Sequence, residues 1–550
     1  MRAISVLLPT AVLATACLIN PGSALAAQQS SCDNLLPPLR QVDGNRVGPE
    51  SCRMQRTALE FNGRPYVRVD LGLDGSVEGW VTKDGDYNEY MTNAPELVFP
   101  QAQASKPRKP YLAVATYQRL RGAAVLLFYP KNRRDWNGKL WVTAHGRGRS
   151  FHNGKLKAWD NYVDAKDPTA DLNKLQKVML AKGYALAVTR RTSEERVGEI
   201  VARLSDGTAV DWIAFNDSHS LIKDYTFVAW NALERFLGKK PSRTYLYGKS
   251  AGARLARGMN YLGSRLNVDG HGGHVFDGFL VDDSAAGTWL PVVMKDGKDV
   301  LLTTAAEKRA FVPQLELVHQ LYVNVNNHDL PDFVTESFLA NKYRNAHILL
   351  SKGLGDKFRM YAIRQMSHDG GSTLPDGRNG KIRILDLSLL MDGVVDILDN
   401  WVEGGTPPPS RSDWPEIGDA NHDGVIENPA ISFPEVACPL GVYYPWPKYG
   451  SGETSYAAFT GQGIEPIDKQ GVYVDMNRNG LWDFRETPSQ AWQRLGLLRA
   501  GQTLTRARYA SCIHDAAEKL HRQGFFSAAT VSLYAKKAQA RNLAPGSDAE

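Results

Sequence analysis

The segment that most constrains the fold is a glycine–serine turn between a β-prone run and a helix-prone run. Residues Thr244–Tyr247 are β-branched or aromatic with one leucine, and small and apolar side chains recur at helical spacing after the turn. Between them lies Gly248–Gly252, a Gly-x-Ser-x-Gly sequence. So tight a turn accepts only glycine on either side of the serine and lifts the serine hydroxyl clear of the backbone. The pattern predicts that Ser250 is a nucleophile; the competing interpretation is an ordinary glycine-rich turn.

Strand-like and helix-like patterns alternate through the middle of the chain. Such alternation predicts an α/β fold, with a mostly parallel sheet covered by helices on both faces. Ligands of such sheets bind at the carboxyl ends of the strands. We expect strands at 123–129, 139–144, 184–189, 244–247, 275–281, 315–325 and 358–363, and helices at 212–237 and 382–402.

Four segments follow from the composition along the chain. Residues 1–27 are typical of a secretory signal, with a basic start, an apolar run too short to span a bilayer, and a small-x-small cleavage site. Residues 28–110 form a β-rich N-terminal extension, 111–405 the α/β catalytic domain, and 406–550 a C-terminal region that begins at a proline run. The signal predicts a secreted or periplasmic protein; a lipid-modified Cys17 is the alternative to a cleaved signal.

Composition excludes several function classes. Hydrophobic residues make up 43% of the 550 residues and charged ones 23%, which is typical of a globular protein. The net charge of +6 is modest for this length and comes without a long basic run, so we expect no nucleic acid partner. No later segment is apolar enough for a membrane span.

Four cysteines remain after the signal: Cys32, Cys52, Cys438 and Cys512. An even number in an exported protein predicts two disulfide bonds. Three connectivities are possible, and proximity in sequence favours Cys32–Cys52 with Cys438–Cys512.

A serine needs a base to take its proton at neutral pH. His368 is the expected base, since it follows the last predicted strand and precedes a glycine pair that lets the loop reach over the site. A carboxylate must hold the histidine in the correct tautomer. Asp329 is our choice, and the sequence leaves other acids open: Asp332, Glu336, Asp282 and Asp283.

The tetrahedral intermediate needs two backbone donors. Ala251, directly after the serine, is one by the geometry of the turn. The other is expected from the glycine-containing loop at Gly146 and Arg147, where the backbone can approach the substrate closely. A plain turn at the end of a strand is the competing interpretation of that loop.

Over about residues 110–405 the chain resembles the α/β-hydrolase superfamily in three features. These are the strand–Gly-x-Ser-x-Gly–helix, the upstream His-Gly-x-Gly at 145–148, and the order serine, acid, histidine. The stretch 385–408 also resembles the end of secreted tannase-like and feruloyl-esterase-like enzymes. The resemblance implies hydrolysis of a carboxylic ester through an acyl-enzyme. In the tannase and feruloyl esterase pattern, disulfide-linked cysteines adjoin the serine and histidine, whereas Lys249 and Asp369 stand there in this chain.

Two acidic loops in the C-terminal region have the spacing of calcium loops, with oxygen ligands at positions 1, 3, 5, 7, 9 and 12. The second loop fits throughout, with Asp475, Asn477, Asn479, Leu481 (by its backbone carbonyl), Asp483 and Glu486. The first loop fits over its first nine positions, with Asp419, Asn421, Asp423, Val425 and Glu427, but Ala430 stands at the twelfth. We expect structural calcium; a turn held by its own Asn and Asp side chains is the alternative.

These patterns together predict an exported serine esterase acting on an ester substrate whose acyl and alcohol groups remain open. One alternative is a polyester or polymer depolymerase, with the aromatic segment 443–449 as a docking surface. Another is a non-catalytic binding protein on a hydrolase scaffold.

Overall fold

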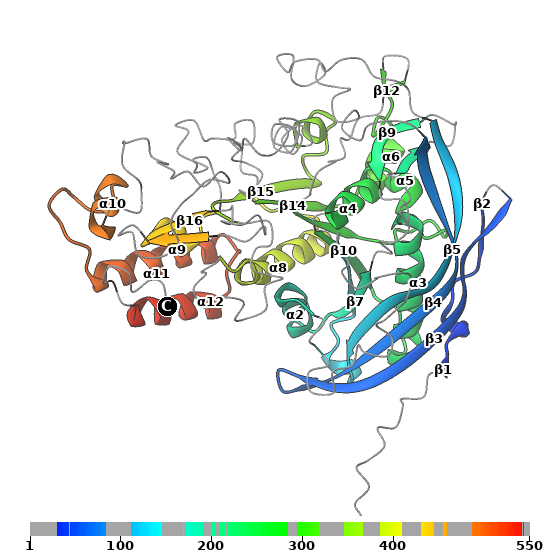
Figure 1. Cartoon of the computed structure of the whole chain (residues 1–550), viewed down its shortest axis with the longest axis horizontal. Coiled ribbons are helices and arrows are strands. Elements are labelled where there is room, and N and C mark those ends of the chain that lie inside the picture. Colours follow the sequence, from blue (N-terminus) through cyan, green and yellow to red (C-terminus); the bar gives the residue numbers. More distant parts are fainter. Residues whose placement is uncertain are drawn as a thin grey trace, which may run out of the picture.

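The computed structural model describes residues 30–42, 44–83, 112–145, 169, 172–190, 200–203, 209–214, 218–249, 251–283, 294–295, 298–319, 346–366, 385–409, 431–444, 455–458, 487–541 and 543. Its centre is one mixed sheet of eleven strands with helices on both faces (Figure 1). The α/β class predicted from the sequence is therefore confirmed.

The parallel half of the sheet carries the short, apolar strands. In spatial order these are β7 (Ala185–Arg190), β6 (Lys139–His145), β10 (Arg243–Lys249), β11 (Gly278–Asp282), β14 (Gln314–His319) and β15 (Phe358–Ile363). Every neighbouring pair among these six runs parallel. Apolar runs without strict alternation are typical of strands buried on both faces, and β10, β11, β14 and β15 are buried along almost their whole length.

Long antiparallel strands continue the sheet beyond β7. Strand β5 (Leu112–Pro130) pairs antiparallel with both β7 and β4 (Arg64–Lys83), and β4 pairs with β3 (Asn45–Phe61). The short β1 (Ser30–Ser31) and β2 (Arg40–Val42) pair with β3. These strands curve along one side of the molecule (Figure 1). The β-like pieces expected in 28–110 therefore extend the same sheet as the parallel strands.

Helices cover the two faces of the sheet in separate groups. Side chains of α2 (Lys174–Ala181) and α8 (Ser388–Gly404) belong to one apolar cluster, and those of α3 (Ser218–Leu237) and α4 (Ala251–Tyr261) to the other. Helix α8 ends where Gly405 takes the left-handed conformation at φ +67°, which few other residues adopt without strain. The core thus lies in two layers, one on each side of the sheet.

The start of the helix expected at 212–237 is wrong. The chain forms strand β9 (Ala209–Ala214) first, paired antiparallel with β8 (Ile200–Arg203), and the helix begins only at Ser218. Val210, Asp211 and Trp212 alternate between apolar and polar, so the start of the expected helix also fits a two-residue period, and pairing with β8 decides for the strand.

The C-terminal helices pack at the end of the sheet beyond β15 (Figure 1). Helices α10 (Pro488–Arg494), α11 (Arg506–Arg522) and α12 (Ala528–Ala540) contribute to the same apolar cluster as α8. A Cβ added to Gly393 of α8 would lie 2.2 Å from the carbonyl oxygen of Gly524, so the two backbones touch there. The remaining short elements are α5 (Gly263–Leu266), α6 (Ala305–Ala310), α9 (Pro434–Ala437), β12 (Met294–Lys295), β13 (Lys298–Asp299), β16 (Gly441–Tyr444) and β17 (Ser455–Ala458).

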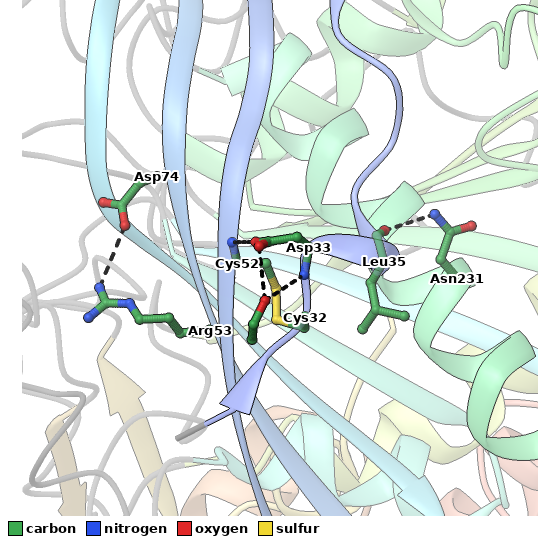
Figure 2. Close-up of a disulfide and its surroundings, with 8 residues drawn as sticks. Cys32, Asp33, Leu35, Cys52, Arg53, Asp74 and Asn231 are labelled. Atoms are coloured by element: carbon green, nitrogen blue, oxygen red, sulfur yellow. Dashed lines mark hydrogen bonds and ion pairs between the residues drawn. A yellow bond between two sulfur atoms is a disulfide. The ribbon is translucent and has the colours of Figure 1, made fainter. Parts of the chain in front are cut away.

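Both disulfides form as sequence proximity favoured. Cys438–Cys512 joins the end of α9 to α11, and Cys32–Cys52 joins the N-terminal segment to β3. Figure 2 shows the second of these, with the Asp33 carboxylate accepting the Cys52 backbone N–H at 2.6 Å. The Asn231 amide of α3 donates to the Leu35 carbonyl at 2.8 Å, so the N-terminal segment is fixed to both the sheet and a helix. Among the described residues, no helix is both long and apolar enough to cross a bilayer.

Candidate active site

The Gly-x-Ser-x-Gly segment joins a strand to a helix, as its sequence predicts. Strand β10 ends at Lys249 and helix α4 begins at Ala251, so one residue, Ser250, separates them. Ser250 itself lies outside the described residues, and of Ala251 only its place in the helix is described. The strand before Ser250 and the helix after it are therefore the two elements that a nucleophile elbow requires.

Steric packing requires the glycines on both sides of this turn. A Cβ on Gly248 would lie 2.2 Å from the Gly252 carbonyl oxygen, and a Cβ on Gly252 would lie 2.1 Å from the Ala144 carbonyl oxygen. Real Cβ atoms do not approach backbone oxygen so closely. Helix α4 can pack against β10 and β6 at this angle only without side chains at these two positions.

Strand register brings the ends of three strands level at the turn. Lys249 pairs with His145 of β6 on one side and with Asp282 of β11 on the other. The chain after His145 therefore starts next to the elbow, where the second oxyanion donor is expected. Gly146 and Arg147 lie outside the described residues.

The expected base and acid follow strands that end at the same edge. His319, the last residue of β14, pairs in register with Ile363, the last residue of β15. His368 comes five residues after β15 and Asp329 ten residues after β14, and both lie outside the described residues. The same is true of Asp332 and Glu336.

The two acids left open after β11 are engaged by neighbouring side chains. Asp282 and Asp283 are fully buried. The Tyr247 hydroxyl donates to Asp282 Oδ2 at 2.6 Å, and His319 Nε2 lies 2.9 Å from Asp282 Oδ1. His319 Nδ1 lies 3.6 Å from Asp283 Oδ2, and the ammonium of Lys249 lies 3.9 Å from Asp282 Oδ2.

No motif in the sequence marks His319 or Tyr247 as a site residue. The signal that identifies them is the position of each at the carboxyl end of a strand, together with the register that aligns those ends. In sequence, Lys249 is marked only as the residue that stands where tannase-like and feruloyl-esterase-like enzymes have a cysteine. The structure shows instead that its side chain is buried beside a carboxylate.

Burial and charge act in opposite directions on this group. Burial alone raises the pKa of the Asp282 carboxyl, but the charges of Lys249 and His319, with hydrogen bonds from His319 and Tyr247, outweigh it and hold that pKa below its usual range. Burial and the Asp282 charge raise the pKa of the Tyr247 hydroxyl well above its usual value. Asp282 is thus an anion, and Tyr247 is its neutral donor.

Both acidic loops lie outside the described residues. Within the part of the chain that is described, no group of three or more His, Cys, Asp or Glu side chains has the arrangement of a metal site.

The solved structures that resemble parts of this chain include several hydrolases of low sequence identity. Poly(aspartic acid) hydrolase-1 from Sphingomonas sp. KT-1 is 14% identical with a TM-score of 0.29, and the match covers 44% of this chain and 86% of that one. LpqC, a poly(3-hydroxybutyrate) depolymerase from Bordetella parapertussis, is 14% identical with a TM-score of 0.27 and coverage of 52% and 88%. MGS-M1, an alpha/beta hydrolase from a Medee basin deep-sea metagenome library, is 12% identical with a TM-score of 0.26 and coverage of 51% and 93%.

No protein-family model matches the chain, and no curated protein matches its sequence. The fold described above rests on the strand order and register of this chain alone.

Proposed function

We propose that this chain is an exported serine hydrolase of the α/β-hydrolase superfamily that cleaves carboxylic esters through an acyl-enzyme on Ser250. The observation that carries the proposal is the sterically required glycine pair around Ser250, at the carboxyl end of a central parallel strand. A plain β–α turn has no need of such tight packing on both sides of one serine. The arrangement is the one that exposes a nucleophile above a sheet.

The proposed base and acid follow strands that lie close to the strand of the proposed nucleophile. Strand β15 lies three strand spacings from β10, a distance of about 14 Å. Directly after β15 the chain turns at Arg364 and Gln365, with Gln365 at φ +52°, and His368 follows three residues later. Asp329 has ten residues in which to leave β14 and return toward the histidine, so chain length permits its proposed role.

The reaction then proceeds in two halves. Ser250 Oγ attacks the ester carbonyl carbon as His368 takes its proton, and Asp329 orients the imidazole. The backbone N–H of Ala251 and one from the Gly146–Arg147 loop stabilise the oxyanion. The bond to the alcohol breaks as His368 returns the proton to the leaving oxygen. Water, deprotonated by His368, attacks the acyl-enzyme and releases the acid and Ser250.

Labelling with a fluorophosphonate tests the nucleophile directly. We expect the wild-type chain to be labelled covalently on Ser250 and the Ser250→Ala variant to give no label. Ser242→Ala is the matched control, because Ser242 precedes the opposite end of the same strand and donates to the Gly138 carbonyl at 3.1 Å. A folded wild-type chain that takes no label would refute the enzyme proposal and favour the binding-protein alternative.

We also propose that calcium stabilises the C-terminal region through the loop that runs from Asp475 to Glu486. Calcium at 100 times its dissociation constant adds about 2.7 kcal/mol to the free energy of unfolding. We therefore expect a chelator to lower the melting temperature by a few degrees and calcium to restore it. Asp475→Ala is expected to lose this response, while Asp515→Ala, an exposed acid of α11, keeps it. An unchanged melting temperature after chelation would contradict the proposal.

A further inference from the structure

A buried group of charged and polar side chains lies at the carboxyl ends of β10, β11 and β14. It contains Tyr247 and Lys249 from β10, Asp282 from β11 and His319 from β14, and none of the four is more than 2% exposed. We call it the strand-end cluster. On the same face of β11 and β14, the buried Leu280 and Leu317 precede its members, so the cluster begins where the apolar rows of these strands end.

All four side chains lie on one face of the sheet. Side chains two residues apart along a strand share a face. Lys249 continues the row of Tyr245 and Tyr247, while the other two members continue rows that contain Leu280 and Leu317, and these apolar residues all belong to the cluster covered by α8. The contacts across the strands therefore follow from register alone.

Burying these charges is unfavourable unless contacts with partner groups compensate for the lost hydration. Removing an ammonium or a carboxylate from water costs several kcal/mol per ion, and apolar side chains of similar size often stabilise a core better. Buried charges with specific partners also occur preferentially at functional sites. In this chain the ammonium belongs to the residue directly before Ser250.

The neighbouring Asp283 extends the same set of contacts. Its backbone has a left-handed conformation with φ +45°, which is strained for a residue with a side chain. Its N–H donates to the Leu317 carbonyl at 3.0 Å, and its carboxylate accepts the His319 backbone N–H at 3.1 Å. The ends of β11 and β14 are therefore joined by backbone as well as side-chain contacts.

We propose that the strand-end cluster positions the nucleophile: Lys249, held by Asp282 and through it by His319, fixes the end of β10 so that Ser250 stays at the point where attack occurs. This inference rests on the proposed function. Tyr247, Lys249, Asp282 and His319 are positioning residues in it, since they act through the backbone of the elbow. A displacement of about 1 Å at a reacting group can lower a rate about 100-fold.

The test separates positioning from folding stability with a pair of variants. Lys249→Met leaves the Asp282 carboxylate without the ammonium, so the melting temperature and the rate of fluorophosphonate labelling of Ser250 both fall. The double variant Lys249→Met/Asp282→Asn has neither the ammonium nor the carboxylate. The new amide oxygen at position 282 can still accept a hydrogen bond from the Tyr247 hydroxyl. We expect the double variant to recover most of the melting temperature, yet to be labelled about 100-fold more slowly than wild type.

Steady-state kinetics on p-nitrophenyl acetate give a second readout. Loss of positioning lowers kcat and leaves KM within about twofold, because the substrate pocket is not altered. Tyr247→Phe, which removes one hydroxyl and keeps the ring, is expected to fold and to show a smaller decrease, about fivefold, in the labelling rate. It keeps the test decisive if the Lys249 variants do not fold.

The control is another buried ion pair in the same sheet. Arg68 Nε lies 2.6 Å from Asp70 Oδ1 on β4, four strands away from β10. Arg68→Met/Asp70→Asn is expected to keep the wild-type labelling rate. The positioning role is wrong if two folded variants, Lys249→Met/Asp282→Asn and Tyr247→Phe, are both labelled at the wild-type rate. In that case the proposal of a serine hydrolase still holds. If wild type takes no label, the proposed function fails and this inference fails with it.

Discussion

Replacing Gly252 with alanine is expected to lower the labelling rate of Ser250 at least about 100-fold. The added methyl would lie 2.1 Å from the carbonyl oxygen of Ala144 and 2.8 Å from its carbonyl carbon, and both are backbone atoms of β6. Neither atom can rotate away, so either α4 or the end of β6 must move. Because Ser250 connects β10 to α4, a shift of about 1 Å moves the nucleophile out of line with its oxyanion donors.

The matched control is a glycine with open space around it. No atom lies within 4 Å of a Cβ on Gly404, at the end of α8. Gly404→Ala is expected to leave labelling unchanged and to stabilise the helix by about 0.5–1 kcal/mol. Melting temperatures of both variants establish that the protein is folded. Wild-type labelling of Gly252→Ala, with an unchanged melting temperature, would show that the turn is not a strained elbow.

The elbow was predictable because its information is local. Gly248, Ser250 and Gly252 are close in sequence, and the strand and helix on either side each have their own periodicity. Strand β15 has the bounds 358–363 that the sequence predicts, and both cysteine pairs follow from proximity. Local patterns thus predicted the α/β class and the strand and helix on either side of Ser250.

The strand-end cluster depends on information that is not local. Lys249, Asp282 and His319 are separated by more than thirty residues at each step, and only the sheet order β10–β11–β14 brings them together. In sequence, Asp282 and Asp283 are two acids after a strand, equally suited to a catalytic role. Register places Asp282 beside Lys249, whereas Asp283 has a left-handed backbone conformation and donates its N–H to the Leu317 carbonyl.

Replacing Glu316 with leucine is expected to lower the free energy of unfolding by about 3–5 kcal/mol, the largest effect on stability that we predict for one substitution. Arg257 of α4 donates from Nε to Glu316 Oε2 of β14 at 3.0 Å, and both side chains are fully buried. Leucine fills the space but leaves the guanidinium charged inside the core. Arginine stays protonated in proteins, so it cannot escape this cost by losing its proton.

Removing the arginine as well should restore most of the lost stability. Arg257→Met/Glu316→Leu replaces the ion pair with apolar side chains of similar length, and such replacements are often neutral or stabilising. Urea unfolding of the two single variants and the double variant measures the coupling between the residues as a double-mutant cycle. A double variant as unstable as Glu316→Leu would contradict the argument, since it would show that the loss comes from packing.

The same cycle separates two ways in which α4 is fixed to the sheet. The amide of Asn260, on the same helix, donates to the side chain of Gln314 and to the Val312 carbonyl, each at 3.0 Å, and accepts the Val312 N–H. These neutral bonds remain in the double variant, so the helix should keep its place without the ion pair. We therefore expect Arg257→Met/Glu316→Leu to be labelled at Ser250 at the wild-type rate. A slower rate at full stability would mean that the pair helps to orient the nucleophile from the opposite face of the sheet.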